Sequence, residues 1–231
     1  MLLLSNSRNP GSGWLDHAEG EIRDFLGPPR ATLLFFPFAA VSMSFGDYAA
    51  MARKRFARMG YRLIGAHRAR PSAARHAAGF VAGGGNTFRL LDEMQRRGWL
   101  AAVERGVRSG KPYIGWSAGS NLACPSIRTT NDMPIVEPRS LSAMALLPFQ
   151  LNPHYTERSL SRHGGETRDE RIAEFQALNP GVPVLGLREG SLLRLEGGRL
   201  ELHLGPGAKL FANSGRMKNF NAGADLSFLL K

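Results

Sequence analysis

A serine between two glycines carries the clearest chemical signal in this chain of 231 residues. The motif Gly115-Trp116-Ser117-Ala118-Gly119 directly follows a short apolar run that begins at Tyr113. At a strand-to-helix turn of this kind, the backbone pushes the serine hydroxyl clear of the sheet, and flanking glycines avoid a collision across the turn. The amide of Ala118 then lies at a helix N-terminus, where backbone N–H groups favour negative charge. The motif predicts that Ser117 is a nucleophile beside an oxyanion donor.

A second glycine-rich loop, Gly83-Gly84-Gly85-Asn86-Thr87, also follows an apolar run and opens a helical stretch. Such a loop presents backbone N–H groups to an oxyanion or to another anion. A dinucleotide site is the rival interpretation, but Phe88 stands where the third glycine of Gly-x-Gly-x-x-Gly is needed. We therefore favour a backbone donor loop over a nucleotide site.

A serine hydroxyl needs a base to remove its proton, and histidine suits neutral pH. Among the six histidines, His154 follows a short apolar run, where a loop would present it over the sheet edge, and His163 lies nearby in a glycine-containing stretch. The residues alone leave both as candidates, with His154 favoured.

The base in turn needs a carboxylate to fix its tautomer, and Asp132 and Glu189 are the best placed acids. We favour Glu189, because the carboxyl end of the strand predicted at 182–187 should lie beside the nucleophile loop in a parallel sheet. Asp132 is followed closely by Pro134, which suits a residue that shapes the substrate pocket.

Short apolar runs alternate with amphipathic stretches, a pattern typical of an α/β fold with a mainly parallel sheet flanked by helices. Functional loops of such folds collect at the carboxyl ends of the strands. We expect strands at 2–4, 32–38, 61–65, 79–82, 113–115 and 182–187, and helices at 14–25, 45–58, 87–97, 100–108 and 167–178. Hairpins follow from 192 to 204, with a turn at Gly197-Gly198. We predict one domain, 1–231, whose polar tail at 215–231 is poorly ordered.

Composition narrows the class of protein. A hydrophobic fraction of 43% suits one α/β core, and no run approaches the ~20 apolar residues that span a bilayer. The net charge of +11 comes from scattered basic residues without interleaved aromatics, which argues against nucleic acid as a partner. Cys124 is the only cysteine, which favours a reducing, cytoplasmic location. No metal-binding motif is present, and we expect neither a metal nor a cofactor.

Longer strings resemble the peptidase E family of bacterial α-aspartyl dipeptidases. They are Leu4-Ser5-Asn6-Ser7, 83–88, 115–119, 127–136, Asn152-Pro153-His154, 165–168 and Glu189-Gly190. The resemblance implies a fold like that of class I glutamine amidotransferases, with serine in place of the cysteine nucleophile.

Position by position, the resemblance makes Ser117 the nucleophile and His154 the general base. It places Glu189 at the third member of the triad and Asp132 at a position also proposed for the charge relay. The chain order of serine, histidine and acid differs from that of α/β-hydrolases.

The resemblance also implies the residues around the substrate. Gly85 and Ala118 supply the oxyanion amides, and Arg168 holds the aspartate side chain, for which a guanidinium fork is suited. Glu166 is a candidate for binding the free amino terminus, and Asn86 is a further candidate for substrate binding.

The expected function is a serine dipeptidase that hydrolyses Asp-X dipeptides through an acyl-enzyme, as a monomer or homodimer. A cyanophycinase-like peptidase of aspartate-rich polymers is the alternative that a long, open cleft would favour. A catalytically silent binding protein on the same scaffold is disfavoured, because Ser117, His154 and a carboxylate are all present.

Overall fold

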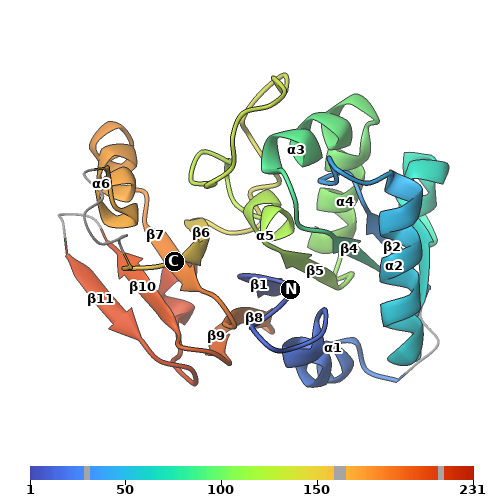
Figure 1. Ribbon diagram of the computed structural model, residues 1–231, viewed down its shortest axis with the longest axis horizontal. Coiled ribbons are helices and arrows are strands. Elements are labelled where there is room, and N and C mark those ends of the chain that lie inside the picture. Colours follow the sequence, from blue (N-terminus) through green and yellow to red (C-terminus); the bar gives the residue numbers. More distant parts are fainter. Residues whose placement is uncertain (29–31, 159–164, 213–215) are drawn as a thin grey trace.

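Two β-sheets lie side by side in the computed structural model, which describes residues 1–28, 32–158, 165–212 and 216–231 (Figure 1). The larger sheet has the strand order β3-β2-β4-β5-β1-β8-β9, and the smaller has the order β11-β10-β7-β6. The strands are β1 (Leu2–Leu4), β2 (Thr32–Phe36), β3 (Arg62–Gly65), β4 (Gly79–Ala82), β5 (Tyr113–Trp116), β6 (Gln150–Tyr155), β7 (Val184–Arg188), β8 (Leu192–Glu196), β9 (Arg199–His203), β10 (Ala208–Phe211) and β11 (Met217–Phe220).

Helices surround the larger sheet and cover one face of the smaller (Figure 1). They are α1 (Glu19–Leu26), α2 (Phe45–Arg58), α3 (Thr87–Arg96), α4 (Trp99–Arg108), α5 (Ala118–Leu122) and α6 (Arg168–Leu178). Ile172 and Phe175 of α6 pack on the smaller sheet at Tyr155, Val184 and Phe211. No helix in the described ranges is long and apolar enough to cross a membrane.

The central strands are apolar on both sides because both faces of the larger sheet are covered. Successive strand residues point to opposite faces, so Leu3 and Phe36 enter one core cluster, whereas Leu2 and Phe35 enter the other. Near-continuous apolar runs are the sequence signature of such doubly covered parallel strands.

Strands β3, β2, β4, β5 and β1 pair in parallel, while β8 and β9 join the sheet antiparallel. This arrangement confirms the predicted α/β fold class with a mainly parallel sheet and C-terminal hairpins. The carboxyl ends of β1, β4 and β5 therefore meet at one edge, where Ser5, Gly83 and Ser117 follow them.

The structure departs from expectation at β6, where a loop was expected to carry His154. The residue instead belongs to a strand that pairs in parallel with β7, with an irregularity between Pro153 and Tyr155. A proline and a bulge inside a short run conceal the alternation by which strands are recognised.

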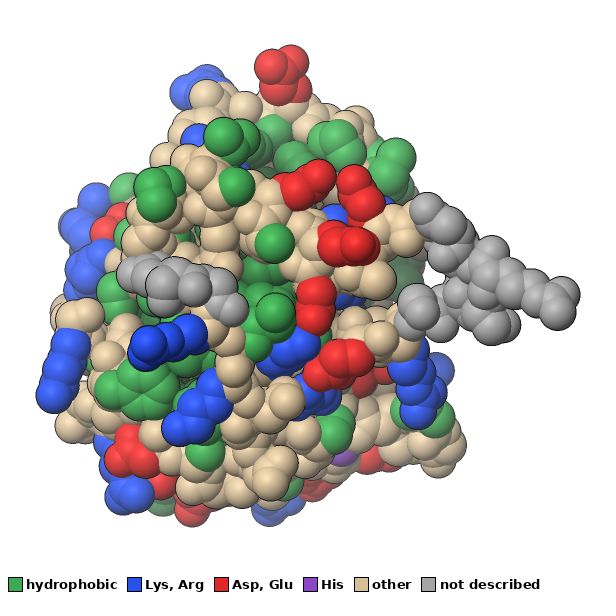
Figure 2. Space-filling view, turned by 90° about the vertical axis from the view of Figure 1, so that its left-hand side faces the viewer, with side chains coloured by type: hydrophobic (Ala, Val, Ile, Leu, Met, Phe, Trp, Pro, Cys, Tyr) green, Lys and Arg blue, Asp and Glu red, His purple; other side chains and the backbone are tan. Residues whose placement is uncertain are grey.

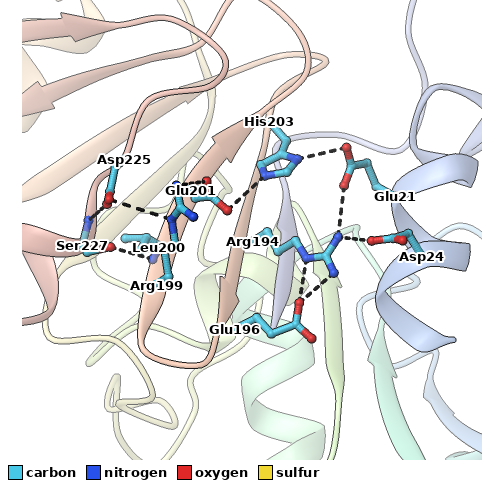
Figure 3. A network of polar contacts seen from close by, with 10 residues as sticks. All are labelled: Glu21, Asp24, Arg194, Glu196, Arg199, Leu200, Glu201, His203, Asp225 and Ser227. Atoms are coloured by element: carbon cyan, nitrogen blue, oxygen red, sulfur yellow. Dashed lines mark hydrogen bonds and ion pairs between the residues drawn. The ribbon is translucent and has the colours of Figure 1, made fainter.

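The tail also differs from the poorly ordered segment expected at 215–231. Residues 216–231 include β11, which pairs with β10, and a 3-10 helix at Ser227–Leu230. Leu226 and Leu229 are buried, and the hydroxyl of Ser227 accepts a hydrogen bond from the backbone N–H of Leu200 on β9 (Figure 3).

Basic side chains are dispersed over the face drawn in Figure 2. Lys and Arg lie there singly and in small groups, interrupted by acidic and apolar side chains. On this face the positive charge forms no continuous stripe.

Candidate active site

Ser117 lies in the turn between β5 and α5 with φ 53° and ψ −112°. Its backbone N–H donates to the carbonyl of Leu4 at 3.1 Å, which holds the turn against β1. A Cβ atom on Gly119 would lie 2.2 Å from the carbonyl oxygen of Ala82, so only glycine fits there. The strained serine and the tight glycine match the nucleophile turn that the motif predicts.

His154 connects Ser117 to Glu189. Its Nε2 atom lies 3.0 Å from Oγ of Ser117, and its Nδ1 atom lies 2.7 Å from Oε1 of Glu189. A carboxylate accepts a hydrogen bond from Nδ1 only when that nitrogen carries the proton, which leaves Nε2 to accept the serine proton. The three side chains therefore have the geometry of nucleophile, base and orienting acid.

The backbone of His154 is held in an unusual conformation by a residue from the first strand's end. His154 has φ 55°, and its N–H donates to Oγ of Ser5 at 2.9 Å. The Ser5 hydroxyl donates in turn to the carbonyl of Leu187 at 2.8 Å. Ser5 thus joins β6, which carries His154, to β7, which precedes Glu189.

Asn6 does the same for the turn that follows Glu189. Its Oδ1 atom accepts a hydrogen bond from the N–H of Gly190 at 2.7 Å, and its Nδ2 atom donates to Asn9 at 2.9 Å. The sequence alone predicts no role for Ser5 or Asn6. The available signal was a pair of polar residues directly after a buried strand that neighbours the nucleophile strand.

Two backbone amides, those of Gly85 and Ala118, are free to bind an anion. Within the described part of the chain, neither N–H donates a hydrogen bond. Gly85 has φ 133°, and a Cβ atom there would lie 2.3 Å from the carbonyl oxygen of Ala39. A side chain at this position would displace the loop from the site.

Tyr48 holds the glycine loop at 83–87 in place through its hydroxyl group. Its hydroxyl donates to the carbonyl of Gly84 at 3.1 Å and accepts from Nε1 of Trp116 at 3.2 Å. Burial raises the pKa of Tyr48, so the hydroxyl keeps its proton and remains a donor.

Asp132 does not contact His154. Its Oδ2 atom accepts hydrogen bonds from the N–H and the hydroxyl of Thr87, at 2.8 and 2.5 Å, and from the hydroxyl of Thr130 at 3.1 Å. Thr87 begins α3, so the carboxylate sits at the N-terminus of that helix, where negative charge is favoured. Between the two predicted acids, it is Glu189 that the structure brings to the base.

Arg168 is the first residue of α6 and is half-buried. Burial and the neighbouring Arg171 lower the pKa of its guanidinium. No carboxylate of the described residues pairs with Arg168, whereas Glu166 forms an exposed ion pair with Arg171 at 3.6 Å. His163, the alternative base, lies outside the described residues.

Asn86 caps α3, because its Oδ1 atom accepts from the N–H of Arg89 at 3.0 Å. Its Nδ2 atom donates to the carbonyl of Met133 at 2.8 Å. The side chain is therefore engaged in holding two loops together, although the residue lines the pocket beside Ser117.

That pocket has a volume of about 380 Å³ and includes both Ser117 and His154 in its wall. Such a volume suits a small ligand.

Cys124, whose thiol would be a nucleophile if it were ionised, is fully buried just beyond α5. Burial raises the pKa of its thiol to about 12, so it stays protonated and unreactive at neutral pH.

Comparison with known proteins identifies the family. The profile of Peptidase family S51 matches residues 1–203. Peptidase E of Streptomyces coelicolor is 47% identical over 100% of this chain and 94% of its own length. Peptidase E of Nostoc sp. is 42% identical over 100% of this chain and 96% of its own.

Two solved structures share the fold. A peptidase from an acI-B1 Actinobacterium superposes with a TM-score of 0.70 at 15% identity, covering 98% of this chain and 96% of its own. A protein from Listeria monocytogenes EGD-e gives a TM-score of 0.67 at 20% identity, covering 88% and 96%. With the full-length relatives and the family profile, the chain belongs to Peptidase family S51 and is a serine peptidase.

Proposed function

We propose that this peptidase is a dipeptidase that hydrolyses Asp-X through a covalent acyl-enzyme on Ser117. The observation that carries the proposal is the hydrogen-bonded series from Ser117 through His154 to Glu189, at 3.0 and 2.7 Å.

In this mechanism, Nε2 of His154 takes the proton of Ser117 as Oγ attacks the carbonyl carbon of aspartate. The tetrahedral oxyanion accepts hydrogen bonds from the free N–H groups of Gly85 and Ala118. His154 then protonates the leaving amine, and a water molecule activated by the same histidine hydrolyses the acyl-enzyme. Glu189 holds the required tautomer and stabilises the imidazolium.

The aspartate is recognised at its two charged groups. Arg168 binds the side-chain carboxylate, a role supported by its half-buried guanidinium without an acidic partner in the described chain. Asp132 binds the free amino terminus, since its Oδ1 atom makes no hydrogen bond with a described residue. Glu166 is the other candidate for this role, but its ion pair with Arg171 competes.

Small free peptides are the expected substrates, and a cytoplasmic location forms part of the proposal. A single, buried cysteine suits a reducing compartment.

The test compares kcat/KM for Asp-Leu, Asn-Leu and acetyl-Asp-Leu. We expect Asp-Leu to be preferred over Asn-Leu by about 100-fold or more, because an uncharged isostere leaves the cation unpaired. Arg168→Ala should collapse that preference, whereas Arg171→Ala, on the same helix, should keep it. Equal turnover of Asn-Leu, or of acetylated and longer aspartyl peptides, would contradict a dipeptidase specific for aspartate.

A further inference from the structure

The pocket beside Ser117 offers no charged side chain to a ligand. Apart from His154, its wall is built from apolar, hydroxyl and amide side chains and from the glycine loop. No Lys, Arg, Asp or Glu of the described chain contributes to it. The pocket therefore cannot neutralise the carboxylate of an aspartate.

Its wall is instead aromatic and sulfur-rich. Trp14 packs edge-on against Trp116 with ring centroids 5.5 Å apart and lies 6.1 Å from the ring of Tyr48. Two methionines also line the pocket: Met43, in the loop after β2, and Met51, on α2. These groups offer a surface suited to an apolar side chain.

Three large hydrophobic side chains of this pocket face solvent. Val41, Met43 and Met51 are 56%, 44% and 40% exposed. Apolar side chains scattered singly over a surface need no explanation, but a group of them around a pocket marks a binding site. Methionine adds adaptability, because its unbranched thioether fills gaps of different shapes.

We infer that this pocket receives the side chain of the leaving residue X, and that the enzyme selects an apolar X such as leucine, methionine or phenylalanine. The inference rests on the proposed function, which puts aspartate on the other side of the scissile bond. Transfer of an unpaired carboxylate into an uncharged pocket is strongly unfavourable. Of the two side chains of Asp-X, only that of X therefore fits here.

Leaving residues X differ in how favourably their side chains enter this uncharged pocket. Burying an apolar side chain is favourable, whereas the ammonium of lysine or the carboxylate of glutamate would lose water without gaining a partner. Selection by a hydrophobic pocket is typically 10- to 200-fold. We expect kcat/KM for Asp-Leu and Asp-Phe to exceed that for Asp-Lys and Asp-Glu by at least about tenfold.

The experiment measures kcat/KM for these four dipeptides with the wild type and with Met51→Glu. The new carboxylate should lower kcat/KM for Asp-Leu by about tenfold or more and raise it for Asp-Lys, which reverses their order. Met217→Glu is the matched control, because Met217 is 56% exposed on β11 and lies outside the pocket. It should leave all four values unchanged.

The outcomes separate this inference from the function on which it rests. Similar kcat/KM values for all four dipeptides, unaltered by Met51→Glu, would overturn the inference and leave an aspartyl dipeptidase intact. A protein whose Ser117 still reacts with a fluorophosphonate, but which turns over no Asp-X dipeptide, would overturn both the inference and the proposed function. Reversal of the Leu-to-Lys order in Met51→Glu, with the preference for Asp over Asn retained, supports both.

Discussion

At the scale of single residues, two residues with strained backbones meet at one hydrogen bond between their side chains. Ser117 and His154 have φ angles of 53° and 55°, a region that non-glycine residues rarely occupy. Each is fixed by a backbone N–H, which donates to Leu4 in one case and to Ser5 in the other. Leu4, the last residue of β1, and Ser5, which follows it, thus hold both Ser117 and His154, and the surrounding structure offsets the strain.

The two candidate acids predict different kinetics. Glu189→Gln should lower kcat for Asp-Leu by roughly 100-fold or more with little change in KM, because the imidazolium forms only as the proton moves. Asp132→Asn should chiefly raise KM and relax the need for a free amino terminus. Steady-state kinetics with Asp-Leu and acetyl-Asp-Leu, with Ser117→Ala as the inactive reference, distinguish them; the reverse pattern would exchange the two roles.

The sequence singles out the residues proposed to react, but not the residues that hold them in place. Local spacing predicts Ser117 and the glycine loop at 83–87, because a tight turn demands glycine at fixed positions. Ser5 and Asn6 act through hydrogen bonds to residues 149 and 184 positions away. Pairings of such separation depend on how the strands are ordered, which a local pattern does not contain.

At the scale of elements, Arg55 ties α2 to the segment that shapes the pocket. Its side chain is buried and donates to the carbonyl oxygens of Trp14, at 2.7 Å, and Leu15, at 3.2 Å. It also pairs with Glu19 of α1 at 2.8 Å. Because Trp14 forms a wall of the pocket, Arg55 connects helix packing to substrate binding.

Replacing Arg55 by methionine should destabilise the fold in a pH-dependent way. The hydrogen bond from Arg55 lowers the pKa of Glu19, so its contribution is present above the unfolded value and is lost as pH falls through the folded value. The loss of unfolding free energy in Arg55→Met should therefore be larger at pH 7 than at pH 3, and KM for Asp-Leu should rise. Urea unfolding checks this, with the exposed Arg53→Met as control; equal losses at both pH values would exclude Glu19 as the partner.

The periodicity of apolar residues predicts most helices and strands of the structure, and the missed strand β6 has a physical cause. The predicted helix 45–58 coincides with α2, where Ser44 caps the start by accepting from the N–H of Asp47. The strand β6 is concealed by Pro153 and by the bulge at His154. The irregularity that hides the strand is also what turns the imidazole toward Ser117.

At the scale of the whole molecule, the site is assembled across the junction of the two sheets. Ser117 follows β5 of the larger sheet, whereas His154 and Glu189 come from β6 and the end of β7 in the smaller (Figure 1). The sequence predicts the strands that precede Ser117 and Glu189, but it predicts neither β6 nor the division of the strands between two sheets. The contacts among these three side chains therefore depend on how firmly the two sheets are joined.

The C-terminal tail covers β9, an edge strand of the larger sheet. The N–H of Leu202 donates to Ala224 at 3.0 Å, and the N–H of Leu226 donates to Leu200 at 2.8 Å, so the tail extends the pairing beyond β9. Side chains along the same edge join β8 and β9 to α1: Arg194 pairs with Asp24, and His203 contacts Glu21 at 3.0 Å (Figure 3). Covering an edge strand protects it from pairing with another chain.

The tail should consequently contribute to global stability, although it lies beyond the matched family profile. Leu226 is fully buried, so Leu226→Ala removes packed apolar surface and should lower the free energy of unfolding by about 2 to 5 kcal/mol. Leu178→Ala is the matched control, because Leu178 is 88% exposed and should change it by less than about 0.5 kcal/mol. Urea titration measures both, and kcat for Asp-Leu should be retained under folding conditions because the tail does not line the pocket. If the tail has no role in the core, both variants should unfold at the same urea concentration. If the tail packs against β9, Leu226→Ala alone should unfold at a lower urea concentration.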